Sequence, residues 1–194
     1  FSIAVISTLT ARAQMLNVLT KDGVTYKFPA AQTGDMLFCA DDTLNIMNKK
    51  LAASDIASMT VDDSEMADNS ISVAYDGAQA KITVAGNIAR YVTPKVSGAH
   101  VNIEQGSDLE QEITYTLSGA SDDGEFYMSG SYKATVELNG LTLTNTTPVT
   151  SGAAVHIQNG KRINIKVGTG TVNTLVDAAA GSQKGCLSVK GHAE

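Results

Sequence analysis

The sequence of 194 residues contains no tryptophan, only three prolines and only two cysteines. Without tryptophan, it lacks the most obvious flat platform for stacking a sugar ring. Two cysteines give no metal-binding spacing. We expect Cys39 and Cys186 to be free and half-buried, and a disulfide between them in an exported protein is the alternative. Scarce proline, 17 glycines and recurring Val, Ile and Thr favour strands joined by tight turns.

Basic residues are also scarce. Lys and Arg number 14 against 20 Asp and Glu, so the net charge is −6. The chain has no cluster of Lys and Arg residues, and an acidic chain repels the phosphate backbone of nucleic acids. We therefore expect no nucleic-acid partner. The sequence also lacks the motifs Gly-x-Ser-x-Gly and His-Glu-x-x-His and a phosphate loop. Their absence argues against enzymes with a serine nucleophile, a catalytic zinc ion or a bound nucleotide phosphate.

The apolar run from Phe1 to Thr10 is shorter than the ~20 residues that a membrane helix needs. It is followed by Ala11-Arg12-Ala13, a small-x-small cleavage signature. We predict that residues 1–13 are the rear part of a secretory signal peptide. The protein is then exported, and is periplasmic, on the cell surface or extracellular, with no transmembrane segment. A buried N-terminal strand is the alternative.

Residues 14–62 are predicted to form a small β module. Apolar residues alternate on both sides of Asp22-Gly23, which is a strong hairpin signal. A second candidate hairpin flanks Asp41-Asp42. Residues 63–70 are polar and acidic without periodicity, so we interpret them as a linker.

From residue 71 to residue 194, short apolar alternations recur and many are closed by glycine. The clearest repeat aligns Ala99-His-Val-Asn-Ile-Glu-Gln-Gly106 with Ala153-Ala-Val-His-Ile-Gln-Asn-Gly160 at an offset of 54 residues. Repeated short strands with turn glycines are typical of a β-solenoid, whose stacked turns bury one continuous core. The predicted fold is therefore all-β, a parallel β-helix preceded by the small β-hairpin module. An antiparallel β-sandwich also has short, evenly spaced strands and is the alternative.

This stacking assigns an inner and an outer face to each strand. Glycine provides the positive φ needed at the corners. His100 and His156 are expected to occupy equivalent, solvated positions, and either Phe126 or Tyr127 should be buried. The residues predicted to point inward are Val136, Leu138, Val155, Ile157, Ile163, Ile165, Leu187 and Val189.

The tightest acidic cluster of this region is Asp122-Asp123-Gly124-Glu125. It is interpreted as a solvated loop. The functional alternatives are a calcium site formed by hard oxygen ligands, which we favour of the two, and a paired acid/base site. Asp177, at another predicted corner, is a further possible ligand. Asp122, Asp123, Glu125 and Asp177 are therefore the calcium candidates.

Residues 71–194 resemble a family of exported bacterial carbohydrate-binding domains. The resemblance is carried by Glu112-Ile-Thr-Tyr-Thr-Leu-Ser-Gly119, Val136-Glu-Leu-Asn-Gly-Leu-Thr-Leu-Thr-Asn145, Ala153-Ala-Val-His-Ile-Gln-Asn-Gly-Lys161 and Thr171-Val-Asn-Thr-Leu-Val-Asp177. It implies a right-handed parallel β-helix similar to polysaccharide lyases, binding to plant cell-wall polysaccharides, and bound calcium. The family's long acidic loop after Asp177 is replaced here by residues 178–185, whose only charge is Lys184.

The function expected from this resemblance is non-catalytic binding of polysaccharide. A structural or adhesin-type surface protein is one alternative. A polysaccharide lyase, in which Lys161, Arg162 or Lys166 would abstract a proton from a calcium-bound uronate, is another. The residues predicted to contact the sugar are Tyr132, His156, Gln158, Lys161 and Asn164.

Overall fold

Strands dominate the computed structural model, which describes residues 14–33, 36–39, 41–182 and 185–194. The all-β prediction is confirmed, whereas the predicted signal peptide lies outside the described residues. Among the described residues, no helix is long and apolar enough to cross a membrane. The elements are β1 (Met15–Thr20), β2 (Val24–Pro29), η1 (Ala30–Gln32), β3 (Leu37–Phe38), β4 (Thr43–Ile46), β5 (Lys49–Ala52), η2 (Ala53–Asp55), β6 (Ile56–Asp62), β7 (Ser70–Asp76), β8 (Gln79–Ala85), η3 (Gly86–Tyr91), β9 (Val92–Ser97), β10 (His100–Gln105), β11 (Ile113–Ser121), β12 (Glu125–Ser129), β13 (Ala134–Thr144), β14 (Val155–Val167), β15 (Thr174–Val176) and β16 (Leu187–Ala193).

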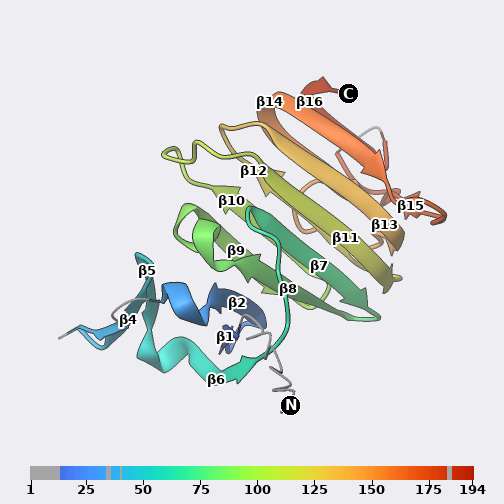
Figure 1. The fold of residues 1–194 in the computed structure, drawn as a ribbon. Helices are drawn as coiled ribbons and strands as arrows, with labels where there is room; N and C mark the ends of the chain where they lie inside the picture. Colours follow the sequence, from blue (N-terminus) through green and yellow to red (C-terminus); the bar gives the residue numbers. More distant parts are fainter. Residues whose placement is uncertain (1–13, 34–35, 40, 183–184) are drawn as a thin grey trace, which may run out of the picture.

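The N-terminal strands form the two predicted hairpins. β1 and β2 pair antiparallel on either side of Asp22-Gly23, and Gly23 has a φ of 88°. Glycine adopts this conformation without steric penalty, so the turn closes tightly. β3 and β4 form the second hairpin. β2 also pairs in parallel with β8, which joins this part of the chain to the same sheet as the rest (Figure 1).

Three sets of parallel pairs organise the remaining chain. Ladder A consists of β7, residues 113–117 of β11, 134–138 of β13 and 163–167 of β14. Ladder B consists of β10, β12, residues 155–158 of β14 and 187–190 of β16. Ladder C consists of residues 119–121 of β11, 141–144 of β13 and β15. From β11 onward the chain passes through ladders A, C and B in turn and then begins again.

The register of ladder B reproduces the sequence repeat. Val101 pairs with Phe126, and Phe126 pairs with Val155. The steps are 126 − 101 = 25 and 155 − 126 = 29 residues, and their sum is the 54-residue offset. The aligned segments therefore lie two strands apart in one ladder, with β12 between them.

Two antiparallel pairs interrupt this pattern. β8 pairs antiparallel with β7, and β9 pairs antiparallel with β10. Each pair is joined by a two-residue loop that begins with a glycine of positive φ, Gly77 or Gly98. Such loops fold the chain straight back into a hairpin. The prediction of parallel rungs throughout 71–194 is thus wrong for residues 79–97.

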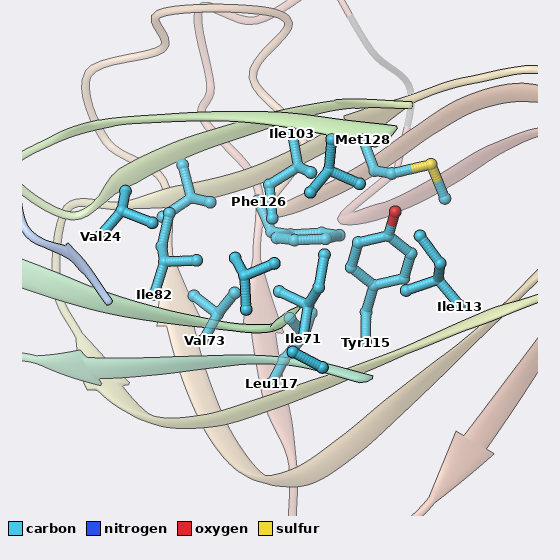
Figure 2. Close-up of a cluster of buried hydrophobic side chains, with 14 of the residues drawn as sticks. Val24, Ile71, Val73, Ile82, Ile103, Ile113, Tyr115, Leu117, Phe126 and Met128 are labelled. Atoms are coloured by element: carbon cyan, nitrogen blue, oxygen red, sulfur yellow. The ribbon is translucent and has the colours of Figure 1, made fainter. Parts of the chain in front are cut away.

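The core lies between ladders A and B. Figure 2 shows Ile103, Phe126 and Met128 of ladder B facing Ile71, Tyr115 and Leu117 of ladder A. The rings of Tyr115 and Phe126 meet edge to face with centroids 5.9 Å apart. Burial raises the pKa of Tyr115, whose hydroxyl accepts a hydrogen bond from Gln105 Nε2 at 3.1 Å. The expectation that Phe126 or Tyr127 is buried is confirmed at Phe126.

Most of the predicted inward residues are buried. The exceptions lie on the last strands of the ladders. Ile165 and Val189 are only half-buried, and Leu187 is 37% exposed. The buried residues of the predicted set are Val136, Leu138, Val155, Ile157 and Ile163.

A glutamine side chain bridges two turns at one corner. Gln105 aligns with Gly130 and Asn159, because their preceding residues Glu104, Ser129 and Gln158 are paired. Gln105 Oε1 accepts a hydrogen bond from Asn159 Nδ2 at 3.2 Å. A Cβ atom on Gly130 would lie 2.1 Å from Gln105 Oε1. Gly130 is therefore needed because any larger residue there would collide with the Gln105 side chain. The positive φ predicted for the corner glycines is found at Gly119, Gly140, Gly160 and Gly191.

We predict that Gly130→Ala destabilises the protein by about 1–3 kcal/mol, because the added methyl group displaces the Gln105 side chain. Urea unfolding measures the change. Gln105→Ala alone also destabilises, through the lost hydrogen bonds. In the double variant the two effects should be non-additive, because the contacts of the added methyl group with the Gln105 amide at 2.1 and 2.6 Å are removed and only the 2.7 Å contact with the Cβ atom of residue 105 remains. Additive effects would contradict the contact.

Candidate functional site

The outer surface of ladder B carries two straight rows of polar and aromatic side chains. The register aligns Asn102 with Tyr127, His156 and Ser188 in the first row, and Glu104 with Ser129, Gln158 and Lys190 in the second. All eight are at least partly exposed, whereas their neighbours Val101, Ile103 and Ile157 are buried. Paired strands lie about 4.8 Å apart, so each row crosses the ladder in steps of that length.

Tyr127 and His156 form the centre of the first row. Their rings meet edge to face with centroids 5.0 Å apart. His156 Nδ1 is 2.8 Å from Ser151 Oγ. Partial burial lowers the pKa of His156, although Gln158 and Glu125 act in the opposite direction. The imidazole is therefore neutral at pH 7, with one donor and one acceptor nitrogen, of which Nδ1 is engaged by Ser151.

Glu125 is a buried carboxylate beneath the loop that precedes β14. Its side chain is 3% exposed. Oε2 accepts a hydrogen bond from Asn145 Nδ2 at 3.0 Å, and Oε1 accepts one from Thr150 Oγ1 at 2.6 Å. These bonds compensate the loss of water around the charge. Together with the contact between Ser151 and His156, they attach the loop to ladder B.

Asp123 holds the other end of this loop. Its Oδ1 accepts hydrogen bonds from the backbone amides of Thr146, at 3.1 Å, and Thr147, at 2.8 Å. Partial burial alone would raise the pKa of Asp123, but hydrogen bonds from the backbone and side chains of Thr147 and Thr146 outweigh it and lower the pKa to about 2. Asp123 is thus ionised at neutral pH.

A cavity of about 410 Å³ opens beside Asp123, at the starting ends of β10 and β12. His100 lies in its wall. His100 Nε2 is 3.8 Å from Asp123 Oδ1, and Nδ1 is 4.0 Å from Glu125 Oε1. The cavity is lined by Gly77, Ala78, Gly98, Ala99, His100, Asp122 and Asp123.

The prediction that His100 and His156 are equivalent and solvated is wrong. The side chain of His100 is only 15% exposed, and the register pairs it with Glu125. His156 pairs instead with Tyr127, which pairs with Asn102. The 54-residue alignment already matched Asn102 to His156, so it contained the correct assignment.

The structure does not bring the predicted sugar-contacting residues to one surface. His156 and Gln158 lie on ladder B, and Lys161 is exposed at the corner that follows. Asn164 lies on ladder A, where its Nδ2 is 3.4 Å from Thr135 Oγ1. Tyr132 is half-buried against the core. The alternation did not identify Tyr127, the aromatic residue of the first row, as a contact residue.

The calcium candidates are likewise not assembled into one centre. Asp122 and Asp177 are exposed, whereas Asp123 and Glu125 bind the loop as described. Among the described residues, no group of three or more His, Cys, Asp and Glu side chains is placed to hold a metal ion.

The three residues considered for a lyase, Lys161, Arg162 and Lys166, do not lie in the two outer rows of ladder B. Lys161 and Arg162 are exposed at the corner, and Lys166 is exposed on ladder A.

The two cysteines, Cys39 and Cys186, are free and half-buried as expected.

A comparison with protein families identifies the class to which this region is similar. Residues 97–191 match the family model described as "Carbohydrate-binding domain-containing protein". The match contains the four strand segments of ladder B and the loop held by Asp123 and Glu125. No curated protein and no solved structure matches the chain.

We predict that Asp123→Asn destabilises the protein at neutral pH, because the neutral amide is a weaker acceptor for the Thr146 and Thr147 amides. A carboxyl group with a lowered pKa stabilises the fold above its unfolded pKa, near 3.9, and loses this effect as the pH falls towards 2. Urea unfolding from pH 2 to pH 7 should therefore show a difference between the proteins that shrinks below about pH 4. A constant difference would assign another role to Asp123.

Proposed function

We propose that ladder B binds polysaccharide without catalysing its cleavage. The observation that carries this proposal is the registered row Asn102, Tyr127 and His156, which lies within the region similar to a carbohydrate-binding domain. Amide and imidazole groups exchange hydrogen bonds with sugar hydroxyls. The Tyr127 ring adds an apolar face and its own hydroxyl.

The shape of this surface favours an extended polymer as ligand. The two rows run across four strands, so successive side chains can contact successive sugar rings. Single contacts of this kind are modest, and affinity should rise steeply with chain length. We propose plant cell-wall polysaccharide as the ligand class and export as the location, which accords with the family resemblance of residues 71–194.

We also propose that the coil formed by ladders A, B and C is a right-handed parallel β-helix. The parallel pairs and the register between successive turns support this interpretation. Crossovers between parallel strands of one sheet are right-handed in about 98% of cases, which supports the handedness. The double-variant cycle of Gln105 and Gly130 tests the stacking, because these residues are 25 positions apart and meet only if turns stack.

We predict that Tyr127→Leu weakens binding to a soluble cell-wall polysaccharide about 2- to 10-fold. The substitution keeps much of the apolar volume but removes the aromatic face and the hydroxyl, a change of about 0.5–1.5 kcal/mol. Affinity electrophoresis in gels containing hydroxyethylcellulose, xylan or polygalacturonate measures the retardation.

Tyr91→Leu is the matched control. Tyr91 is also half-buried but lies in η3, outside ladder B and outside the matched region. Wild-type protein that none of the three polymers retards would contradict carbohydrate binding. Equal retardation of wild type and Tyr127→Leu would contradict the assignment to ladder B.

Calcium binding stays a prediction from the sequence. A cation that binds only the native state raises the melting temperature by mass action. Addition of millimolar calcium to chelator-treated protein should therefore raise the melting temperature, and Asp122→Asn should reduce the effect. An unchanged melting curve would remove calcium from the proposal.

A further inference from the structure

A second cavity lies on the outer surface of the sheet, where the N-terminal strands join ladder A. Its volume is about 410 Å³, within the range of about 300–1,000 Å³ found for ligand pockets. β8, β7 and β11 provide one wall, and the loop between β6 and β7 provides the other. All its lining residues except Thr116 precede residue 97, so the cavity lies almost entirely outside the matched region. It is lined by Lys27, Glu65, Met66, Ala67, Ser70, Ile71, Ser72, Thr83 and Thr116.

Three hydroxyl groups form a row along the strand wall. Thr83 pairs with Ser72, and Ser72 pairs with Thr116, so the three lie side by side on neighbouring strands. All three are half-buried, and within the described residues their hydroxyls form no hydrogen bond. By contrast, Thr135, also on an outward position of ladder A, donates to Glu112 Oε1 at 3.0 Å. The hydroxyls of the row are therefore available to a ligand.

Charged groups of opposite sign complete the polar lining. Lys27 Nζ donates to Ser64 Oγ at 2.7 Å, which uses one of its three donors. Glu65, on the loop, is exposed. An ammonium group and a carboxylate together suit a ligand with both acceptors and donors, such as a polyhydroxylated ring. An anionic ligand would be attracted to Lys27 but repelled by Glu65.

Met66 supplies an apolar contact to the same cavity. It is half-buried and packs against the core, so its position on the loop is fixed. A thioether side chain adapts to an irregular apolar surface. The C–H face of a sugar ring is such a surface.

We propose that this cavity is a second carbohydrate site, which takes a neutral sugar ring with its hydroxyls on the Thr83, Ser72 and Thr116 row and its C–H face on Met66. The inference rests on the proposed function only for the class of ligand. The site is separate from ladder B and is formed jointly with the N-terminal strand β2, which contributes Lys27.

The test records the methyl resonance of Met66 by NMR on the full chain labelled with ¹³C-methyl methionine, and assigns it with Met66→Leu. Cellohexaose and xylohexaose are the neutral probes, and hexagalacturonate is the anionic probe. We expect a neutral probe to shift the Met66 signal in a saturable manner, and hexagalacturonate to shift it less. Thr116→Val, which replaces one hydroxyl by a methyl group of similar size, should weaken this response at least threefold.

Thr114→Val is the matched control, because Thr114 lies on the same strand and face but does not line the cavity. It should respond like wild type, and so should Tyr127→Leu on ladder B. An unshifted Met66 signal with both neutral probes overturns the inference, whether or not the wild type is retarded by polysaccharide. Equal responses of Thr116→Val and Thr114→Val also overturn it, as does a stronger response to hexagalacturonate. Loss of retardation in Tyr127→Leu with a retained Met66 shift would support both sites independently.

Discussion

The parallel register of ladder B is the constraint on which the rest of the structure depends. Val101, Phe126 and Val155 lie one above another although unequal lengths of chain separate them. A slip of one residue in any strand would turn its inward side chains outward and its polar side chains into the core. The same register therefore fixes the apolar core and the polar rows outside. Variation in length is confined to the corners and loops between the ladders.

Steric contacts between turns add specificity to this register. The Gln105 side chain occupies the space above Gly130, and its amide joins Tyr115 on one side and Asn159 on the other. A buried amide is stable only if its partners are in place. Tyr115 in turn touches Phe126 across the core. One chain of contacts thus connects ladder A, ladder B and the corner between them.

The sequence predicted which residues of the repeated segments face the core, because the repeat has a direct physical cause. The alternation of Val155, Ile157 and their counterparts reflects a side-chain period of two on a strand with one buried face. The hairpins around Gly77 and Gly98 do not follow from the repeat, because an apolar alternation is the same in parallel and antiparallel strands. The two-residue loops that begin with these glycines decide the direction of pairing.

The site was harder to predict than the fold, for a geometric reason. Alternation distinguishes inside from outside within one strand, but each corner directs the next strand to a different ladder. Asn164 and His156 both point outward, yet they lie on ladders A and B. Only the register across turns shows which outward residues are neighbours. This is why Tyr127 replaces Tyr132 as the aromatic candidate.

The two candidate surfaces differ in how they can hold a sugar, and the difference follows from their walls. Ladder B is open, so a polymer can lie across several strands and gain affinity by repeating weak contacts. The cavity of Thr83, Ser72 and Thr116 has a second wall in the β6–β7 loop, which limits the length of chain inside it. Its hydroxyls are held at fixed spacing by paired strands, so less ordering entropy is lost on binding. If both proposals hold, ladder B discriminates between polymers by their length, whereas the walled cavity discriminates between sugars by the identity of the ring.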